Sequence, residues 1–187
     1  QKAGINIEFK DYKKTKQENV INEILKLSCE WFQNNLSKQD GLYCREYLHS
    51  RNLSKDTIAK FNLGYSFNSK STLFEYLKTK SFKKEEIIKS NVIKIDKNSK
   101  TKDYFYKRLI FPIMDERGNV IGFGGRALDN SNPKYINSPE SYFFHKRNIL
   151  YNLANAKNVA RKKNNLLICE GYMDVISLYQ NGIQSVV

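Results

Sequence analysis

Four consecutive apolar residues near the carboxyl end of the chain, Leu166 to Cys169, run directly into Glu170 and Gly171. Helical spacing follows over 172–180, Asn181 and Gly182 stop that helix, and a second strand is predicted over 183–187. A strand that is apolar at every position is typical of a parallel sheet buried on both faces. This segment therefore predicts a strand, helix, strand unit, the opening of a doubly wound α/β domain.

Two carboxylates follow the first of these strands. In a doubly wound sheet, ligands bind beyond the carboxyl ends of the strands, and Glu170 falls at that position. Asp174 comes four residues later, so its carboxylate lies over the same face of the new helix. The pair could converge on one divalent cation or on a water molecule. The alternative is that Asp174 only complements the helix dipole and that Glu170 is a solvated loop residue.

The chain before this unit is predicted to be mixed α+β. Apolar periodicity and a cap at Ser54 predict helices over residues 19–36, 42–49, 54–61, 72–79, 83–90 and 153–162. Alternation and turn residues predict strands over 92–95, 104–114 and 120–123, and a loop over 129–139 held by two prolines. Residues 1–17 are polar and lysine-rich, which indicates a linker or arm. We expect three parts, at 1–17, 18–164 and 165–187.

The net charge narrows the choice of partners. Thirty-two Lys and Arg residues stand against 19 Asp and Glu, giving +13 over 187 residues, which favours a polyanion, although lysines can also simply solvate a surface. The three cysteines lack metal-site spacing and indicate a reducing compartment. No apolar run approaches the roughly 20 residues of a membrane span, so we expect a cytoplasmic protein with no membrane partner. The missing initiator Met indicates a piece of a longer chain.

A glycine-rich run offers a second candidate site. Three glycines in Gly122-Phe123-Gly124-Gly125-Arg126 remove side-chain bulk at a predicted strand end, so a ligand could approach closely. The run lacks the Lys-Ser/Thr ending of a phosphate loop. Basic residues interleaved with aromatic residues suit single-stranded nucleic acid, whereas the alternative is a bulge beside an ordinary loop over an aromatic core. The interleaved residues are Arg126, Lys134, His145, Lys146 and Arg147 with Tyr135, Tyr142, Phe143 and Phe144.

Several motifs, in order along the chain, closely resemble the catalytic core of the bacterial replicative DNA primase family. They are RLIFPI at 108–113, GNVIGFGGR at 118–126, PKYINSPE at 133–140, FHK at 144–146 and EGYMDV at 170–175. A weaker similarity extends back to about Trp31. The last motif resembles the first motif of a toprim domain, the Mg²⁺-dependent fold that primases share with topoisomerases and some nucleases. The resemblance therefore covers most of the chain.

The resemblance implies a role for each matching residue. Glu170 matches the catalytic glutamate, a metal-associated acid or base, and Asp174 matches a second acidic residue at the Mg²⁺ (or Mn²⁺) site. Binding of nucleic acid or nucleotide is implied for Arg51, Arg108, Arg126, Lys134, Asn137 and Lys146. The chain departs from the family pattern at Tyr104 and Tyr106, where many members have arginines. This departure weakens the implied binding groove there, although a tyrosine could stack on a base.

The implied activity is synthesis of short RNA primers from rNTPs on a single-stranded DNA template, in the nucleoid or replisome. The chain ends before the second aspartate cluster that two-metal chemistry needs, so we expect it to make no primers by itself. Zinc is expected only in an amino-terminal module, and a replicative helicase partner only through a carboxy-terminal region, both outside this sequence. The alternatives are another toprim enzyme, such as a topoisomerase or a phage primase-helicase, and a single-stranded DNA-binding module without catalysis.

Overall fold

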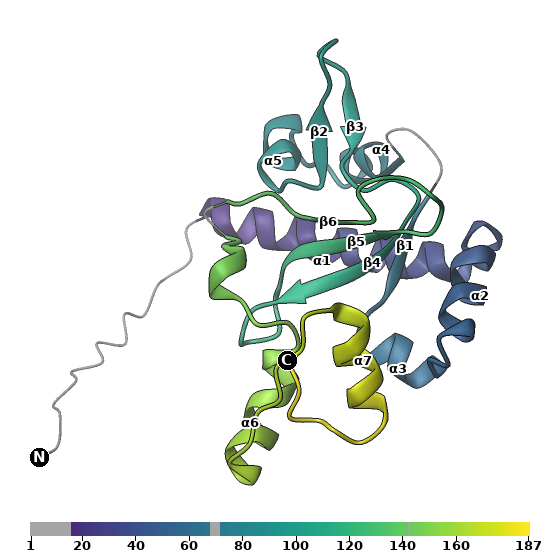
Figure 1. The fold of residues 1–187 in the computed structure, drawn as a ribbon. Coiled ribbons are helices and arrows are strands. Elements are labelled where there is room, and N and C mark those ends of the chain that lie inside the picture. Colours follow the sequence, from purple (N-terminus) through teal and green to yellow (C-terminus); the bar gives the residue numbers. More distant parts are fainter. Residues whose placement is uncertain (1–15, 68–71, 142) are drawn as a thin grey trace, which may run out of the picture.

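A four-stranded antiparallel sheet forms the centre of the molecule (Figure 1). The computed structural model describes residues 16–67, 72–141 and 143–187, so most of the expected arm lies outside the described residues. The order of the strands is β1-β4-β5-β6. Their bounds are β1 Gly64–Ser66, β4 Arg108–Met114, β5 Val120–Ala127 and β6 Tyr135–Asn137.

Helices cover both faces of this sheet. Side chains alternate along β4, so that Ile110 joins a core with α1, whereas Leu109 and Phe111 join a second core with α7. Every β4 residue except Met114 is therefore buried. The helices of the two layers are α1 Lys16–Ser37, α2 Leu42–Ser50, α3 Lys55–Lys60, α6 Leu153–Lys163 and α7 Tyr172–Gln180, with short 3-10 turns at Gln39–Gly41 and Lys146–Asn148.

A smaller unit extends from one end of the sheet, at the top of Figure 1. It contains α4 Thr72–Thr79, α5 Lys84–Lys89 and a hairpin of β2 Ile93–Ile95 with β3 Thr101–Asp103. The carboxylate of Asp103 accepts hydrogen bonds from the backbone N–H groups of Leu73 and Phe74, at 3.0 and 3.2 Å. These N–H groups open α4 and have no partner within the helix, so Asp103 fastens the hairpin to it.

The sequence predicted the helices better than the strands. The helices expected at 42–49, 72–79 and 153–162 are confirmed as α2, α4 and α6, and Ser54 caps α3 by accepting from the N–H of Thr57 at 3.1 Å. The strand expected from residue 104 begins instead at Arg108, and β6 lies inside the expected loop over 129–139. Strands of three residues, such as β1, β3 and β6, are too short to show alternation.

The glycine run is inside a strand rather than at a strand end, which corrects the sequence-based expectation. Gly122, Gly124 and Gly125 all pair with residues of β4. A methyl group on any of them would lie 2.6–2.9 Å from an aromatic ring, that of Phe144, Tyr172 or Phe105 respectively. The glycines therefore admit aromatic rings of this protein against the sheet.

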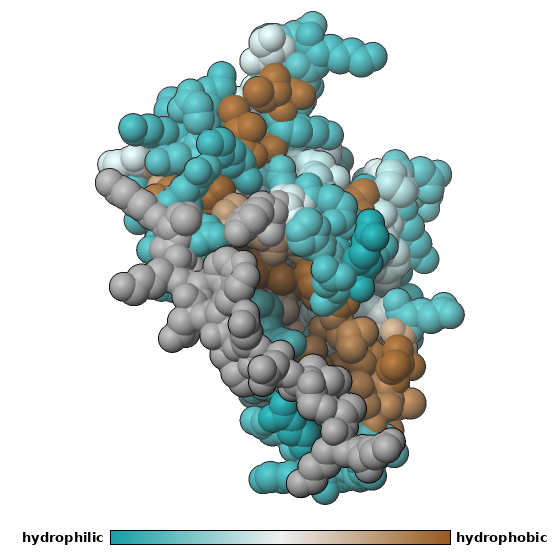
Figure 2. Space-filling view, turned by 90° about the vertical axis from the view of Figure 1, so that its left-hand side faces the viewer, coloured by the Kyte–Doolittle hydropathy of each residue, from teal (hydrophilic) through white to brown (hydrophobic). Residues whose placement is uncertain are grey.

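The C-terminal unit pairs in parallel, as its sequence predicts. Leu167 bridges Val186, and the N–H groups of Leu167 and Cys169 donate to the carbonyls of Ser185 and Val187, both at 2.8 Å. Burial on both faces is not observed, because Leu166 and Leu167 are each 40% exposed in the described chain. Ile168 is 68% exposed, and apolar surface is visible in the lower part of the molecule (Figure 2). Among the described residues, no helix is long and apolar enough to cross a membrane.

Candidate nucleic-acid and metal site

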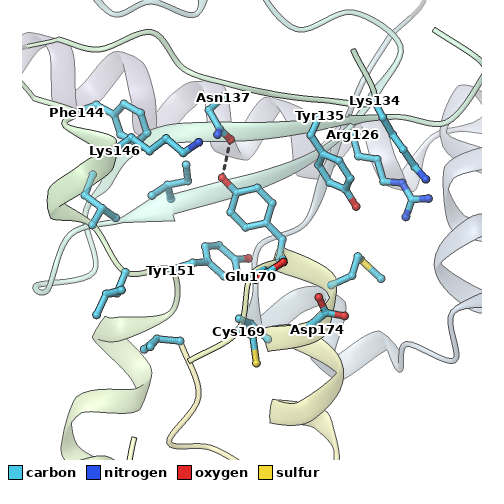
Figure 3. A pocket seen from close by; sticks show the side chains of 18 of the residues that line it. Arg126, Lys134, Tyr135, Asn137, Phe144, Lys146, Tyr151, Cys169, Glu170 and Asp174 are labelled. Atoms are coloured by element: carbon cyan, nitrogen blue, oxygen red, sulfur yellow. Dashed lines mark hydrogen bonds between the residues drawn. The ribbon is translucent and has the colours of Figure 1, made fainter. Parts of the chain in front are cut away.

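A cleft of about 700 Å³ lies between the sheet and the start of α7. It gathers residues that are more than one hundred positions apart in the sequence. Figure 3 shows the basic side chains on the sheet side and the two carboxylates on the α7 side. The predicted site residues that line the cleft are Arg51, Arg126, Lys134, Asn137, Lys146, Glu170 and Asp174.

The acidic side of the cleft is the turn that opens α7. Gly171 is the N-cap of the helix, and its carbonyl accepts from the N–H groups of Asp174 and Val175 at 3.1 and 3.2 Å. A methyl group on Gly171 would lie 2.7 Å from Oδ2 of Asp174, so glycine leaves room for this carboxylate to fold back over the turn. Glu170 and Asp174 are both exposed to solvent. Val175 anchors the turn because it is buried in the core below.

These two carboxylates fit a hard divalent cation, but only as part of a ligand set. Mg²⁺ is commonly held by one or two carboxylates together with water and substrate phosphates. Within residues 16–67, 72–141 and 143–187, no group of three or more His, Cys, Asp or Glu side chains could hold a metal. Glu170 and Asp174 are the two carboxylates that line the cleft, so they could contribute to such a site together with other ligands.

The basic side of the cleft is built mainly on β5 and β6. Arg126 pairs with Tyr135 in the antiparallel register, and the N–H of Ala127 donates to the carbonyl of Lys134 at 2.8 Å. The ion pairs of the described chain are Lys102 with Asp96 and His145 with Glu140, so none of the cleft cations is neutralised by a described carboxylate. A concave surface with unpaired cations attracts anions such as phosphate.

Tyr172 joins the two sides, a role that the sequence analysis missed. Its hydroxyl donates a 2.6 Å hydrogen bond to Oδ1 of Asn137, drawn as a dashed line in Figure 3. Its ring stacks on Phe111 with centroids 5.0 Å apart, over the space that Gly124 leaves open. Burial, with a smaller effect of Tyr135, raises the pKa of Tyr172 to about 12, so it remains a donor at neutral pH. Because Oδ1 accepts this bond, the NH₂ group is the end of the Asn137 amide that could donate to a ligand in the cleft.

A second cleft tyrosine contrasts with Tyr172. The Tyr151 ring meets that of Tyr172 edge to face with centroids 4.7 Å apart. Its hydroxyl is buried and has no hydrogen-bond partner among the described residues. Burial raises the pKa of this phenol far above its ordinary value. Tyr151 therefore supports the cleft by packing alone.

Arg108 is the predicted site residue that does not line the cleft. It is 8% exposed, and its guanidinium donates to the carbonyls of Gly125, Pro133 and Lys134 at 3.3, 3.0 and 3.2 Å. Burial lowers its pKa from the ordinary value for arginine. Because its donors are directed at the backbone, we remove Arg108 from the candidate DNA contacts and regard it as support for the segment that carries Lys134.

Tyr104, at a position where many primases have arginine, also supports the basic side of the cleft by holding β6. Its hydroxyl donates to the backbone carbonyl of Asn137 at 3.2 Å. Tyr106 is 42% exposed and lies outside the residues that line the cleft. The departure from the family pattern therefore strengthens the packing of β6 instead of adding positive charge.

Comparison with known proteins identifies the family. Residues 31–157 match the sequence profile of the DNA primase catalytic core, N-terminal domain. The chain belongs to this family. It is 43% identical over 146 residues to DNA primase of Clostridium acetobutylicum, covering 76% of this chain and 24% of that protein. DNA primase of Escherichia coli K12 is 38% identical over 153 residues, which are 82% of this chain and 26% of that protein.

Solved primase structures share the fold. A DnaG primase catalytic domain bound to single-stranded DNA matches with a TM-score of 0.82 and 36% identity, over 91% of this chain and 55% of that one. The zinc-binding and RNA polymerase domains of Aquifex aeolicus primase match with a TM-score of 0.85 and 32% identity, over 92% and 42% of the two chains. These findings favour the primase family over the topoisomerase and other toprim alternatives.

Proposed function

We propose that this chain is the template-binding part of a primase that makes short RNA primers on single-stranded DNA by Mg²⁺-dependent nucleotidyl transfer. The observation that carries the proposal is the cleft itself, whose unpaired cations face the two carboxylates at the opening of α7. Transfer of a nucleotidyl group needs both features, because the polyanionic template and the metal-bound phosphates must meet at one place.

The acidic and the basic side of the cleft have distinct roles in this proposal. Glu170 and Asp174 would hold Mg²⁺ (or Mn²⁺), which neutralises the charge that develops on the transferred phosphate. Arg126, Lys134 and Lys146 bind the phosphates of template and incoming rNTP through charge-assisted hydrogen bonds. Arg51 extends the path of the template toward α2. Asn137, held by Tyr172, offers an amide donor between the acidic and the basic side of the cleft.

The chain spans about a quarter to a third of the length of the curated relatives it matches. The activity of a whole primase is therefore proposed for the longer protein, with a second aspartate cluster, a zinc module and a helicase-binding region outside this sequence. We divide the sequence into an arm at 1–17, a basic subdomain at 18–164 and the start of a toprim domain at 165–187. The proposal places the protein in the cytoplasm, at the replicating chromosome.

Single substitutions separate the cleft from the general positive charge. We expect Arg126→Ala and Lys134→Ala each to weaken binding of labelled single-stranded DNA by about 1 to 3 kcal/mol, the range for a charge-assisted contact. Lys97→Ala is the matched control, since Lys97 is exposed in the turn between β2 and β3, outside the cleft. Equal losses in all three variants, measured by fluorescence anisotropy, would show that only net charge matters.

A further inference from the structure

Tyr47, on the last turn of α2, lies between two arginines of the proposed template path. The guanidinium carbon of Arg126 is 4.4 Å from the centroid of the Tyr47 ring, and that of Arg51 is 5.3 Å from it. Nε of Arg51 also donates a 3.0 Å hydrogen bond to the Tyr47 hydroxyl. Arg51 follows Tyr47 by four residues at the end of one helix, whereas Arg126 comes from β5. One ring therefore connects cations from two distant parts of the chain.

Arg126 is held with little freedom. It is 8% exposed, and its guanidinium also lies 5.6 Å from the ring of Tyr135. Its Nε is buried and has no hydrogen-bond partner in the part of the chain that the structure describes. A buried charge is costly, and an anion that enters the cleft offsets part of that cost through its opposite charge on the guanidinium. Arg126 is thus prepared for a ligand by its aromatic neighbours.

The arrangement also places two positive charges close together. The distances to the shared ring put the two guanidinium carbons within about 10 Å of each other. Like charges at this spacing repel, and no described carboxylate pairs with either. The electron-rich face of the ring offsets part of this repulsion. Phosphates of one nucleic-acid strand, each carrying one negative charge, are a ligand that would offset the rest.

We propose that Tyr47 is a positioning residue for the template, whose ring holds Arg51 and Arg126 as a paired clamp on the sugar-phosphate backbone of one DNA strand. The inference rests on the proposed function, because it requires the cleft to bind single-stranded DNA. Tyr47 itself carries no charge and makes no phosphate contact in this account. Its effect on binding is therefore exerted through the two arginines.

Two substitutions of Tyr47 dissect this role. Tyr47→Leu removes the ring, and we expect affinity for a labelled oligothymidylate of about 16 nucleotides to fall about fivefold, within the range for cation–π contacts. The slope of log affinity against log salt should become shallower by about 0.7, the value for one lost phosphate contact, although the net charge is unchanged. Tyr47→Phe keeps the ring and loses only the acceptor for Arg51, so we expect a loss of about twofold. Tyr43→Leu is the control, since Tyr43 lies on the same helix and is 59% exposed, and the two arginines lie over the ring of Tyr47 rather than over that of Tyr43.

A test for coupling separates positioning from ordinary packing, because Tyr47 also packs against a core. In an Arg51→Ala, Arg126→Ala background, Tyr47→Leu should change affinity by less than about 1.5-fold, since the groups it positions are gone. An equal loss in both backgrounds would overturn the inference. If Tyr47→Leu does not fold, Tyr47→Phe decides, because its effect must vanish in Arg51→Ala alone. Failure of the unsubstituted protein to bind would instead overturn the proposed function.

Discussion

The hydroxyl of Tyr172 donates a 2.6 Å hydrogen bond to Oδ1 of Asn137. This bond connects α7, on the acidic side of the cleft, to β6, the edge strand on the basic side. The two residues come from α7 and β6, which adjoin the carboxylates and the cations of the cleft respectively. The ring of Tyr172 also stacks on Phe111 of β4, which holds the start of α7 against the sheet. The relative position of the acidic and basic sides of the cleft therefore depends in part on this phenol.

Removing the hydroxyl of Tyr172 should lower the free energy of unfolding, whereas removing the hydroxyl of Tyr151 should not. Tyr172→Phe leaves the acceptor of Asn137 without its donor, and we expect a loss of about 1 kcal/mol in the free energy of unfolding. Tyr151→Phe is the matched control, since its hydroxyl is buried without a described partner, and it should be neutral or stabilising. Urea denaturation of both variants measures the difference. Equal destabilisation would contradict the assigned hydrogen bond.

The three thiols should differ in reactivity. Burial raises the pKa of Cys29 to about 11 and that of Cys44 to about 12, so at pH 8 roughly one Cys29 thiol in a thousand is ionised, and fewer of Cys44. Cys169 is only half-buried and lines the cleft. Ellman's reagent should therefore modify Cys169 first, and single-stranded DNA should slow that reaction. Labelling of Cys44 at the rate of Cys169 would show that the second core is more open than described.

The β2–β3 hairpin should weaken at low pH through Asp96. Hydrogen bonding to Lys102, and to the N–H groups of Lys100 and Asn98, lowers the pKa of Asp96 from 3.8 to about 2. Because the pKa is lower in the folded state, the contribution to stability is complete above about pH 5 and is lost as the pH falls toward 2. An NMR titration should give a midpoint near 2. In Asp96→Asn the amide resonances of Asn98 and Lys100, which donate to this side chain, should lose the transition, and a midpoint near 3.8 for Asp96 in the unsubstituted protein would contradict the interaction.

The sequence predicted the helices, and seven residues that prove to line the cleft, because both predictions depend on local signals. Apolar spacing and a cap at Ser54 define helices without reference to the rest of the fold, and family motifs mark Glu170 and Lys134. Arg108 was misplaced because its motif gives no sign that three backbone carbonyls would surround its guanidinium. Tyr47 was missed because its partner Arg126 approaches from a strand far along the chain. Only the folded structure brings such pairs together.

The most direct test of the central claim is primer synthesis by a full-length protein that contains this segment, with Glu170→Gln compared against the unsubstituted enzyme. The substitution is nearly isosteric and removes charge and basicity from the metal side of the cleft. Glu116→Gln is the control, because it removes the same charge at an exposed hairpin turn. With rNTPs, Mg²⁺ and single-stranded DNA supplied, we expect Glu170→Gln to lower primer synthesis by about a hundredfold or more, with DNA affinity unchanged. Synthesis within about threefold of the unsubstituted enzyme would contradict the account.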